Sequence, residues 1–163
     1  MTEPTDALAA LAALGIEAPT REHAPVFTVD EMMAVCGDMP GAHTKNLFLR
    51  DGKRTFFLVT LRHDTALDLK ALRGLIGARG GLSFASAEAL QETLGVASGS
   101  VSPLAVVNDA GRAVTVCLER ALLSAETVNV HPLRNDRTTA LRPDDLLRFL
   151  REQGYEPVLF DLA

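Results

Sequence analysis

The chain has 163 residues and a mass of 17.5 kDa, which predicts one domain, residues 1–163, with a core that needs no disulfide or metal for stability. With 47% hydrophobic and 23% charged residues, the composition excludes a disordered chain and a coiled coil. The net charge of −5 argues against a protein that coats nucleic acid nonspecifically, although a local basic patch could still recognise one nucleic-acid end.

The first half of the chain predicts helices around one β-hairpin. Helices are expected over residues 5–14, capped by Thr5 and ended by Gly15, over 28–37, where Thr28 and Glu31 have capping-box spacing, and over 68–76. Residues 19–25 are expected to be extended. Two β-type runs, 44–50 and 54–61, flank Asp51-Gly52 and give the strongest hairpin pattern in the sequence.

The second half predicts more strands and two further helices. A short strand is expected over 82–85 and a capped helix over 86–94, followed by a loop over 97–103. Strands over 104–107 and 113–118 are expected to form a second hairpin, followed by a strand over 127–130, a helix over 144–153 opened by Pro143, and a strand over 157–162. This order predicts an α+β fold, with a mixed, mostly antiparallel sheet curled toward a barrel and helices packed around it.

The N-terminal sequence and the short apolar runs predict a soluble, cytoplasmic protein that does not contact a membrane. The acidic N-terminus does not match a signal peptide, and no apolar run approaches the roughly 20 residues needed to cross a bilayer. Cys36 and Cys117 lie in apolar stretches and are expected to be buried, reduced thiols.

Most motifs of known enzyme classes are missing. The sequence has no P-loop, no GxGxxG after a strand, no HExxH and no GxSxG. The four histidines are far apart in sequence, and none pairs with another histidine or cysteine at metal-ligand spacing. No metal and no cofactor are therefore expected, while a zinc site assembled from scattered ligands stays open as the less favoured alternative.

Three local features could carry chemistry. Strand alternation places Lys45 on one face with Leu47 and Leu49, and Asn46 on the other, so the lysine either reaches the rim or points into a cavity toward an anion or a carbonyl. The Gly99–Pro103 loop could present backbone N–H groups to an oxyanion or phosphate, or be a plain connection. His131 precedes a proline that restricts its backbone, and a buried, satisfied histidine is the alternative.

Together and in this order, these features resemble the YbaK-like, prolyl-tRNA synthetase-associated editing-domain family. The resemblance covers nearly the whole chain from Thr28 onward. It rests on Thr44-Lys45-Asn46-Leu47-Phe48-Leu49, on Gly99-Ser100-Val101-Ser102-Pro103, and on His131-Pro132-Leu133 with Asn135 and Thr138-Thr139-Ala140. Within the family, the chain looks most similar to the free-standing branch that clears alanine from mischarged prolyl-tRNA.

The resemblance implies trans-editing hydrolysis of the aminoacyl ester of Ala-tRNA(Pro), with the tRNA(Pro) acceptor end and prolyl-tRNA synthetase as partners and no DNA. It implies catalytic roles for Lys45, Gly99 and His131, with Lys45 holding the terminal phosphate or the scissile carbonyl region. It also implies that the substrate is bound by Thr44, Asn46, Ser100, Val101, Ser102, Pro103 and Asn135. A noncatalytic module that binds tRNA ends or a synthetase is the alternative, and a metal-dependent or small-molecule hydrolase is a third possibility.

The acidic net charge is the main tension in this interpretation. Arg50, Lys53 and Arg54 flank the first hairpin turn, while Arg134 and Arg137 follow His131. If these residues gather at one pocket rim, they could guide an acceptor stem despite the overall charge.

Overall fold

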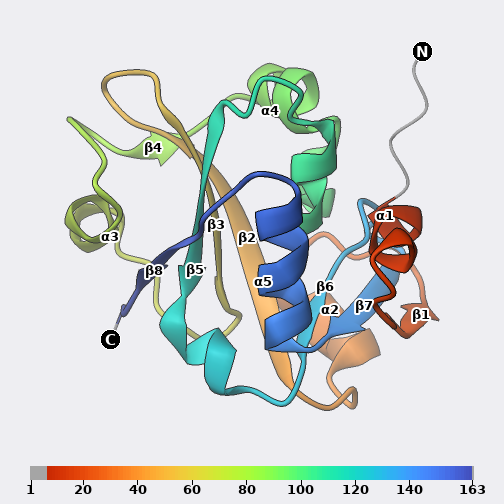
Figure 1. Cartoon of the computed structure of the whole chain (residues 1–163). Coiled ribbons are helices and arrows are strands. Elements are labelled where there is room, and N and C mark those ends of the chain that lie inside the picture. Colours follow the sequence, from red (N-terminus) through yellow and green to blue (C-terminus); the bar gives the residue numbers. More distant parts are fainter. Residues whose placement is uncertain (1–6, 163) are drawn as a thin grey trace.

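The computed structural model describes residues 7–162 and arranges their strands in one open, mixed sheet (Figure 1). The strands are β1 (Thr20–Glu22), β2 (Ala42–Arg50), β3 (Phe56–Arg62), β4 (Ser83–Phe84), β5 (Val114–Glu119), β6 (Val128–Val130), β7 (Arg137–Leu141) and β8 (Val158–Phe160). Their order is β1-β7-β6-β2-β3-β5-β8, with β4 paired beside β2. The predicted α+β class and mixed sheet are confirmed; the sheet stays open, with β1 and β8 at its two ends.

The sheet combines both strand directions. Pairs β1–β7, β6–β7, β2–β3 and β2–β4 are antiparallel. Pairs β2–β6, β3–β5 and β5–β8 are parallel. Strand β2 joins the two halves of the sheet, because it pairs with β6 at one end and with β3 along its length.

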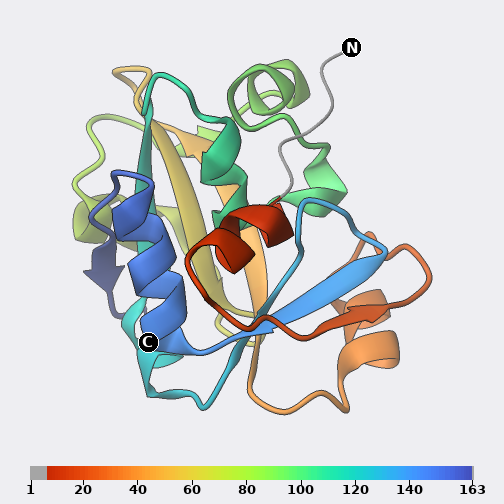
Figure 2. The same cartoon turned by 45° about the vertical axis from the view of Figure 1, so that its right-hand side comes forward.

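Helices cover both faces of the sheet (Figure 2). They are α1 (Ala7–Ala13), α2 (Val29–Cys36), α3 (Leu69–Ile76), α4 (Ala87–Leu94) and α5 (Pro143–Glu152), with the 3-10 helices η1 (Ser98–Ser100), η2 (Pro103–Asn108) and η3 (Arg120–Ser124). On one face of the sheet, α1, α4, α5 and η2 pack together in the main core. On the other face, α3 covers a second core. Helix α2 has a small core of its own, made by Val26, Met32 and Cys36.

Local signals in the sequence set most of these elements. The carboxylate of Asp51 accepts hydrogen bonds from the N–H groups of Lys53 and Thr55, both at 2.9 Å, and closes the predicted hairpin turn. The hydroxyls of Thr28 and Ser86 cap α2 and α4 as expected. The predicted cap Thr5 lies outside the described residues. Cys36 and Cys117 are both buried, as predicted.

The predicted strand over 104–107, and with it the second hairpin, is wrong. The Ser102 hydroxyl accepts a hydrogen bond from the Leu104 N–H, and Pro103 takes the first position of η2, so this segment starts a 3-10 helix instead. Strand β5 therefore has no hairpin partner and pairs in parallel with β3. Strand β7 was not predicted from pattern, because its sequence, RTTAL, has little apolar alternation.

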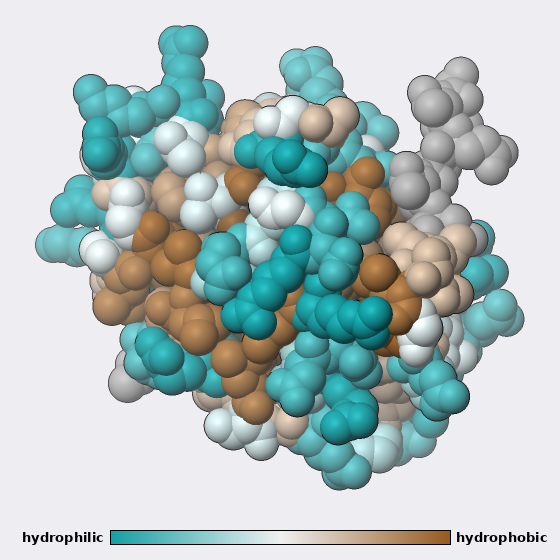
Figure 3. Space-filling model, in the orientation of Figure 1, coloured by the Kyte–Doolittle hydropathy of each residue, from teal (hydrophilic) through white to brown (hydrophobic). Residues whose placement is uncertain are grey.

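The surface in the view of Figure 1 is mostly hydrophilic (Figure 3). A hydrophobic area lies over β8, the edge strand, where Val158 and Leu159 are partly exposed. Among residues 7–162, no helix is both long and apolar enough to cross a membrane.

One edge of β2 is open in its middle. Strand β6 pairs only with Ala42 and His43, and β4 pairs only with Leu49 and Arg50. Between these two pairings, the described part of the chain places no strand against this edge of β2. The gap positions the site described next.

Candidate functional site

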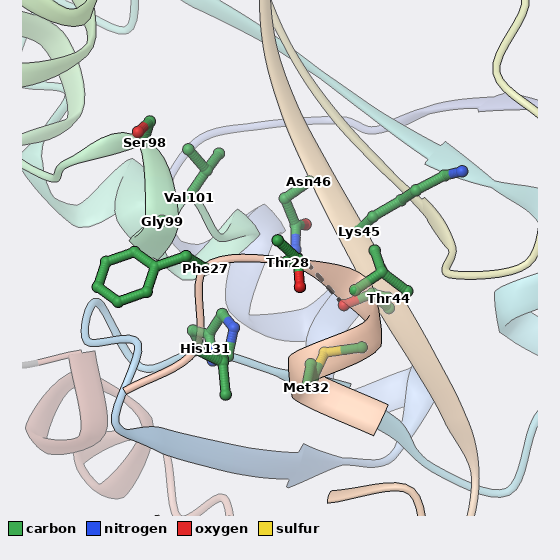
Figure 4. Close-up of a pocket in the computed structure, with 12 residues that line it drawn as sticks. Phe27, Thr28, Met32, Thr44, Lys45, Asn46, Ser98, Gly99, Val101 and His131 are labelled. Atoms are coloured by element: carbon green, nitrogen blue, oxygen red, sulfur yellow. Dashed lines mark hydrogen bonds between the residues drawn. The ribbon is translucent and has the colours of Figure 1, made fainter. Parts of the chain in front are cut away.

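A cavity of about 170 Å³ lies between β2, the segment before and within α2, and the turn η1 (Figure 4). Six of the residues predicted for the site line it: Thr44, Lys45, Asn46, Gly99, Val101 and His131. The other lining residues were not predicted: Val26, Phe27, Thr28, Val29, Met32 and Ser98.

The β2 wall of this cavity is held by a chain of hydrogen bonds. The buried Thr60 hydroxyl donates to Asn46 Oδ1 at 2.6 Å, which fixes the orientation of the amide. The Asn46 amide donates a long bond, 3.4 Å, to Thr44 Oγ1, and the Thr44 hydroxyl donates to the Asn129 carbonyl at 2.7 Å. An amide nitrogen carries two hydrogens, so Asn46 keeps a second N–H for a ligand.

Lys45 borders the cavity, but its side chain extends away from it, on the face of β2 opposite Asn46 (Figure 4). Its ammonium donates to the carbonyl oxygen of Thr65. Among the described residues, Lys45 forms no ion pair with a carboxylate. The predicted alternation of faces is thus confirmed, and the lysine is a cation with a neutral partner beside the cavity.

The Gly99–Pro103 loop divides into lining and supporting residues. Gly99 and Val101 line the cavity. A Cβ atom at Gly99 would lie 3.3 Å from Asn135 Nδ2 and 3.3 Å from Phe27 Cδ1, so a larger residue here would require these side chains to shift by a few tenths of an ångström. Ser100, Ser102 and Pro103 are buried and do not line the cavity; they build the turns that hold Gly99 in place.

His131 presents one ring nitrogen to a ligand. Its Nδ1–H donates to the Arg137 carbonyl at 2.8 Å, because a carbonyl can only accept. In the neutral ring, Nε2 then carries a lone pair, and no partner for it is found among residues 7–162. Burial lowers the pKa of His131, and the nearby His23 ring acts in the same direction, whereas the hydrogen bond to Arg137 opposes them.

The opposite wall of the cavity comes from the segment before α2 and from its first turns. Asn135 was predicted to bind substrate, but its amide donates to the Val26 carbonyl at 3.0 Å, and the Val26 N–H donates to the Asn135 carbonyl at 3.0 Å. These two reciprocal hydrogen bonds fix the position of Val26 and therefore of the wall to which it belongs. The one signal in the sequence for this wall was the apolar pair Val26-Phe27 between Pro25 and the cap Thr28.

The basic residues do not gather at one rim. Arg134 and Arg137 lie in ion pairs with Asp136 and Glu22, at 2.7 and 3.4 Å. Arg50, Lys53 and Arg54 lie at the hairpin turn, at the other end of β2. At the usual rise of a strand, Arg50 is about 20 Å from Thr44. Their convergence, considered from the sequence, is therefore not observed.

The arrangement suits the binding and polarisation of a small carbonyl compound. It combines an oriented amide donor, a neutral imidazole acceptor and a backbone turn around a small cavity. The Thr44 hydroxyl is engaged with a carbonyl and not with a base, so it lacks the pairing of an activated nucleophile. Among the described residues, no group of three histidine, cysteine or acidic side chains could hold a metal ion.

Comparisons with known proteins converge on one family. A family model described as "Aminoacyl-tRNA editing domain" matches residues 23–149. The chain is 44% identical over 148 residues to "Prolyl-tRNA synthetase associated domain-containing protein 1" of Danio rerio, covering 90% of this chain and 80% of that protein.

A bacterial relative and a solved structure agree with this match. The chain is 40% identical over 134 residues to "Prolyl-tRNA editing protein ProX" of Acetoanaerobium sticklandii, covering 82% of this chain and 81% of that protein. The crystal structure of a candidate trans-editing enzyme for prolyl tRNA synthetase superposes with a TM-score of 0.71 at 22% identity, covering 96% of this chain and 93% of that one. At this identity, the superposition supports the fold alone.

Proposed function

Because the chain belongs to the aminoacyl-tRNA editing domain family, we propose that it hydrolyses, in trans, the ester that joins a wrong amino acid to tRNA, with Ala-tRNA(Pro) as its substrate. The observation that carries the proposal is the Asn46 amide, held by Thr60 at the wall of a small cavity. The relatives named for prolyl-tRNA editing and for association with prolyl-tRNA synthetase support proline tRNA as the carrier and the synthetase as a partner.

The chemistry needs few catalytic groups, because an aminoacyl ester is already reactive. Water loses a proton as it adds to the ester carbonyl carbon, and the resulting tetrahedral oxyanion collapses as the bond to the ribose oxygen breaks. The departing ribose oxygen takes up a proton in place of the one that water lost and leaves as a hydroxyl. The second N–H of Asn46 and the backbone around Gly99 stabilise the oxyanion. The lone pair on His131 Nε2 accepts a hydrogen bond from the substrate α-amino group and orients it. This scheme requires no metal ion.

Lys45 takes the terminal phosphate in this proposal. Its ammonium exchanges the Thr65 carbonyl for a phosphate oxygen, a charged acceptor that forms a stronger hydrogen bond. The flexible four-carbon stem of lysine permits this change of partner.

The size of the cavity supports a small aminoacyl group. Its volume of about 170 Å³ lies below the roughly 300 Å³ at which pockets for larger ligands begin. A synthetase pocket sized for proline discriminates poorly against smaller side chains, by about 10–200-fold for small apolar differences. We propose that this cavity admits alanine and excludes proline, which would supply the missing selectivity.

The deciding experiment measures deacylation of tRNA(Pro) charged with alanine, cysteine, serine or proline. We expect alanine to be released fastest and proline to be spared, with rates unchanged by a metal chelator. No release above the buffer rate, with saturable tRNA binding, would instead establish a noncatalytic binding module. Loss of activity with chelator would contradict the metal-independent scheme.

A further inference from the structure

Phe27 is the most exposed large hydrophobic side chain of the described residues, with 71% of its surface accessible. The chain is poor in aromatic residues, with seven Phe, one Tyr and no Trp. Besides Phe27, only Phe84 is an exposed large aromatic in residues 7–162, at 58%, and it lies on β4 outside the cavity lining. An exposed phenyl ring at a cavity therefore needs an explanation.

The Phe27 ring lies at the cavity and beside the η1 turn. Phe27 lines the cavity, and its Cδ1 would be 3.3 Å from a Cβ atom at Gly99. Figure 4 shows the ring on the same side of the cavity as Gly99 and His131, across from β2. A hydrophobic residue before a helix cap often packs against the fourth helical residue, here Met32. Because most of the Phe27 surface is accessible, such packing does not bury its ring.

The backbone that carries this ring is fixed. The reciprocal hydrogen bonds between Val26 and Asn135 hold the preceding residue on both sides. The following residue, Thr28, caps α2. The backbone of Phe27 is thus held at the cavity by its neighbours, so a ligand that stacks on the ring has only the side chain, and not the backbone, to order.

We propose that Phe27 is the stacking platform for the terminal nucleobase of the tRNA. This inference rests on the proposed function, because the ester joins the aminoacyl group to the terminal ribose. A cavity of about 170 Å³ that receives the aminoacyl group leaves the ribose and its base at the mouth, where the exposed ring lies. Stacking also gives affinity without positive charge, which suits a chain of net charge −5.

The kinetic test compares Phe27→Leu, which keeps an apolar side chain without an aromatic face, with Phe27→Tyr, which keeps the face. We expect Phe27→Leu to raise the half-saturating tRNA concentration about tenfold, the usual cost of one lost stacked base, with a smaller effect on the rate at saturation. Phe27→Tyr and the control Phe84→Leu should stay within twofold of wild type. A Phe27→Leu variant that binds and deacylates like wild type would overturn the proposal while leaving the proposed function intact.

A second test does not depend on activity. Since the chain has no tryptophan, Phe27→Trp places a single fluorophore at the cavity, and Phe84→Trp is its matched control. We expect saturable quenching of Trp fluorescence in the Phe27 variant by the RNA trinucleotide CCA, and none by the same trinucleotide with an abasic terminal ribose. Equal responses to both, or equal quenching in the Phe84 variant, would overturn the stacking assignment. Selective quenching in a protein that releases no amino acid would uphold stacking and reject the proposed function.

Discussion

The two walls of the cavity are built from different kinds of structure. On one side, Thr44 and Asn46 belong to a central strand, and their side chains join a hydrogen-bond chain that begins at the fully buried Thr60. On the other side, Val26 and Phe27 precede a helix whose core consists of three buried residues. The first wall is anchored in the sheet, and the second is attached to it through a small cluster and the Asn135 contact.

This difference predicts a division of labour between the walls. A polar group that must meet a developing charge within a few tenths of an ångström needs the fixed position that a paired strand provides. A wall that contacts the apolar and aromatic parts of a ligand needs only a surface that matches the shape of the ligand. Substitutions on β2 should therefore lower the rate at saturation, and substitutions in residues 26–32 should change binding.

The largest expected effect is on β2, for Asn46→Asp. The new carboxylate still accepts the Thr60 hydroxyl, so the fold is kept, but it has no N–H to donate to an oxyanion. We expect the saturating deacylation rate to fall by about 100-fold or more, as for loss of one oxyanion donor. The matched change on the other wall, Met32→Leu, should keep the saturating rate. Similar rates for both variants would remove the distinction between the walls.

Lys45→Ala should have the next largest effect, a loss of at least about tenfold in kcat/KM if the ammonium holds substrate charge. Lys53→Ala is the control, because Lys53 is exposed on the hairpin turn away from the cavity. Steady-state deacylation of both variants measures the difference. Full activity of Lys45→Ala would mean that Lys45 takes no part in the reaction and that β2 contributes to it only through the face that carries Asn46.

Gly99→Ala probes the place where the turn η1 meets the second wall. The added methyl would press on the Phe27 ring and on the Asn135 amide, each 3.3 Å away, and displace the wall by a few tenths of an ångström. We expect a loss of roughly tenfold in kcat/KM, since small misplacements of bound substrate are costly. Gly74→Ala is the control: nothing lies near its Cβ, and alanine in helix α3 should raise stability by about 0.5–1 kcal/mol with unchanged activity.

The β2 wall was much easier to predict from the sequence than the opposite one. The Asp51-Gly52 turn set the hairpin, and strand alternation then placed Lys45 and Asn46 on opposite faces. Alternation could not tell which face borders a cavity, because that depends on η1, a segment distant in the chain. The ammonium of Lys45 reaches Thr65, a partner 20 residues away that no local pattern indicates.

The second wall escaped prediction because its residues have no periodicity. Val26 and Phe27 stand in an irregular segment, and the lining role of Met32 depends on how α2 sits against the sheet. Asn135 was assigned to substrate, but tertiary structure uses its amide to hold Val26. The prediction of a strand over 104–107 was wrong for a local reason. Ser102 and Pro103 start a helix, and this signal outweighs the apolar run that follows them.

The pH dependence of deacylation tests the imidazole between the two walls. Because the pKa of folded His131 is lowered, the ring is neutral at pH 7, and its Nε2 acceptor is lost as the pH falls through that lowered value, below about 6.5. The same shift makes the folded state lose stability as the pH falls from about 6.5 through the lowered pKa. We expect less than a twofold loss of rate between pH 7.5 and pH 6.5, then a decline that His131→Gln abolishes. A decline that persists in His131→Gln would assign the titration to another group.

The smallest expected effect separates stability from binding at the second wall. Thr28 Oγ1 and Ser86 Oγ cap two helices of equal length by the same bond, to the N–H of Glu31 at 3.1 Å and of Ala89 at 3.0 Å. Thr28→Ala and Ser86→Ala should each cost about 1 kcal/mol in denaturant unfolding. Thr28 lines the cavity and Ser86 does not, so only Thr28→Ala should also raise the half-saturating tRNA concentration, by two- to threefold. Equal half-saturating concentrations in both variants would mean that the first turn of α2 does not shape the substrate site, and the second wall would then reduce to Val26, Phe27 and Met32.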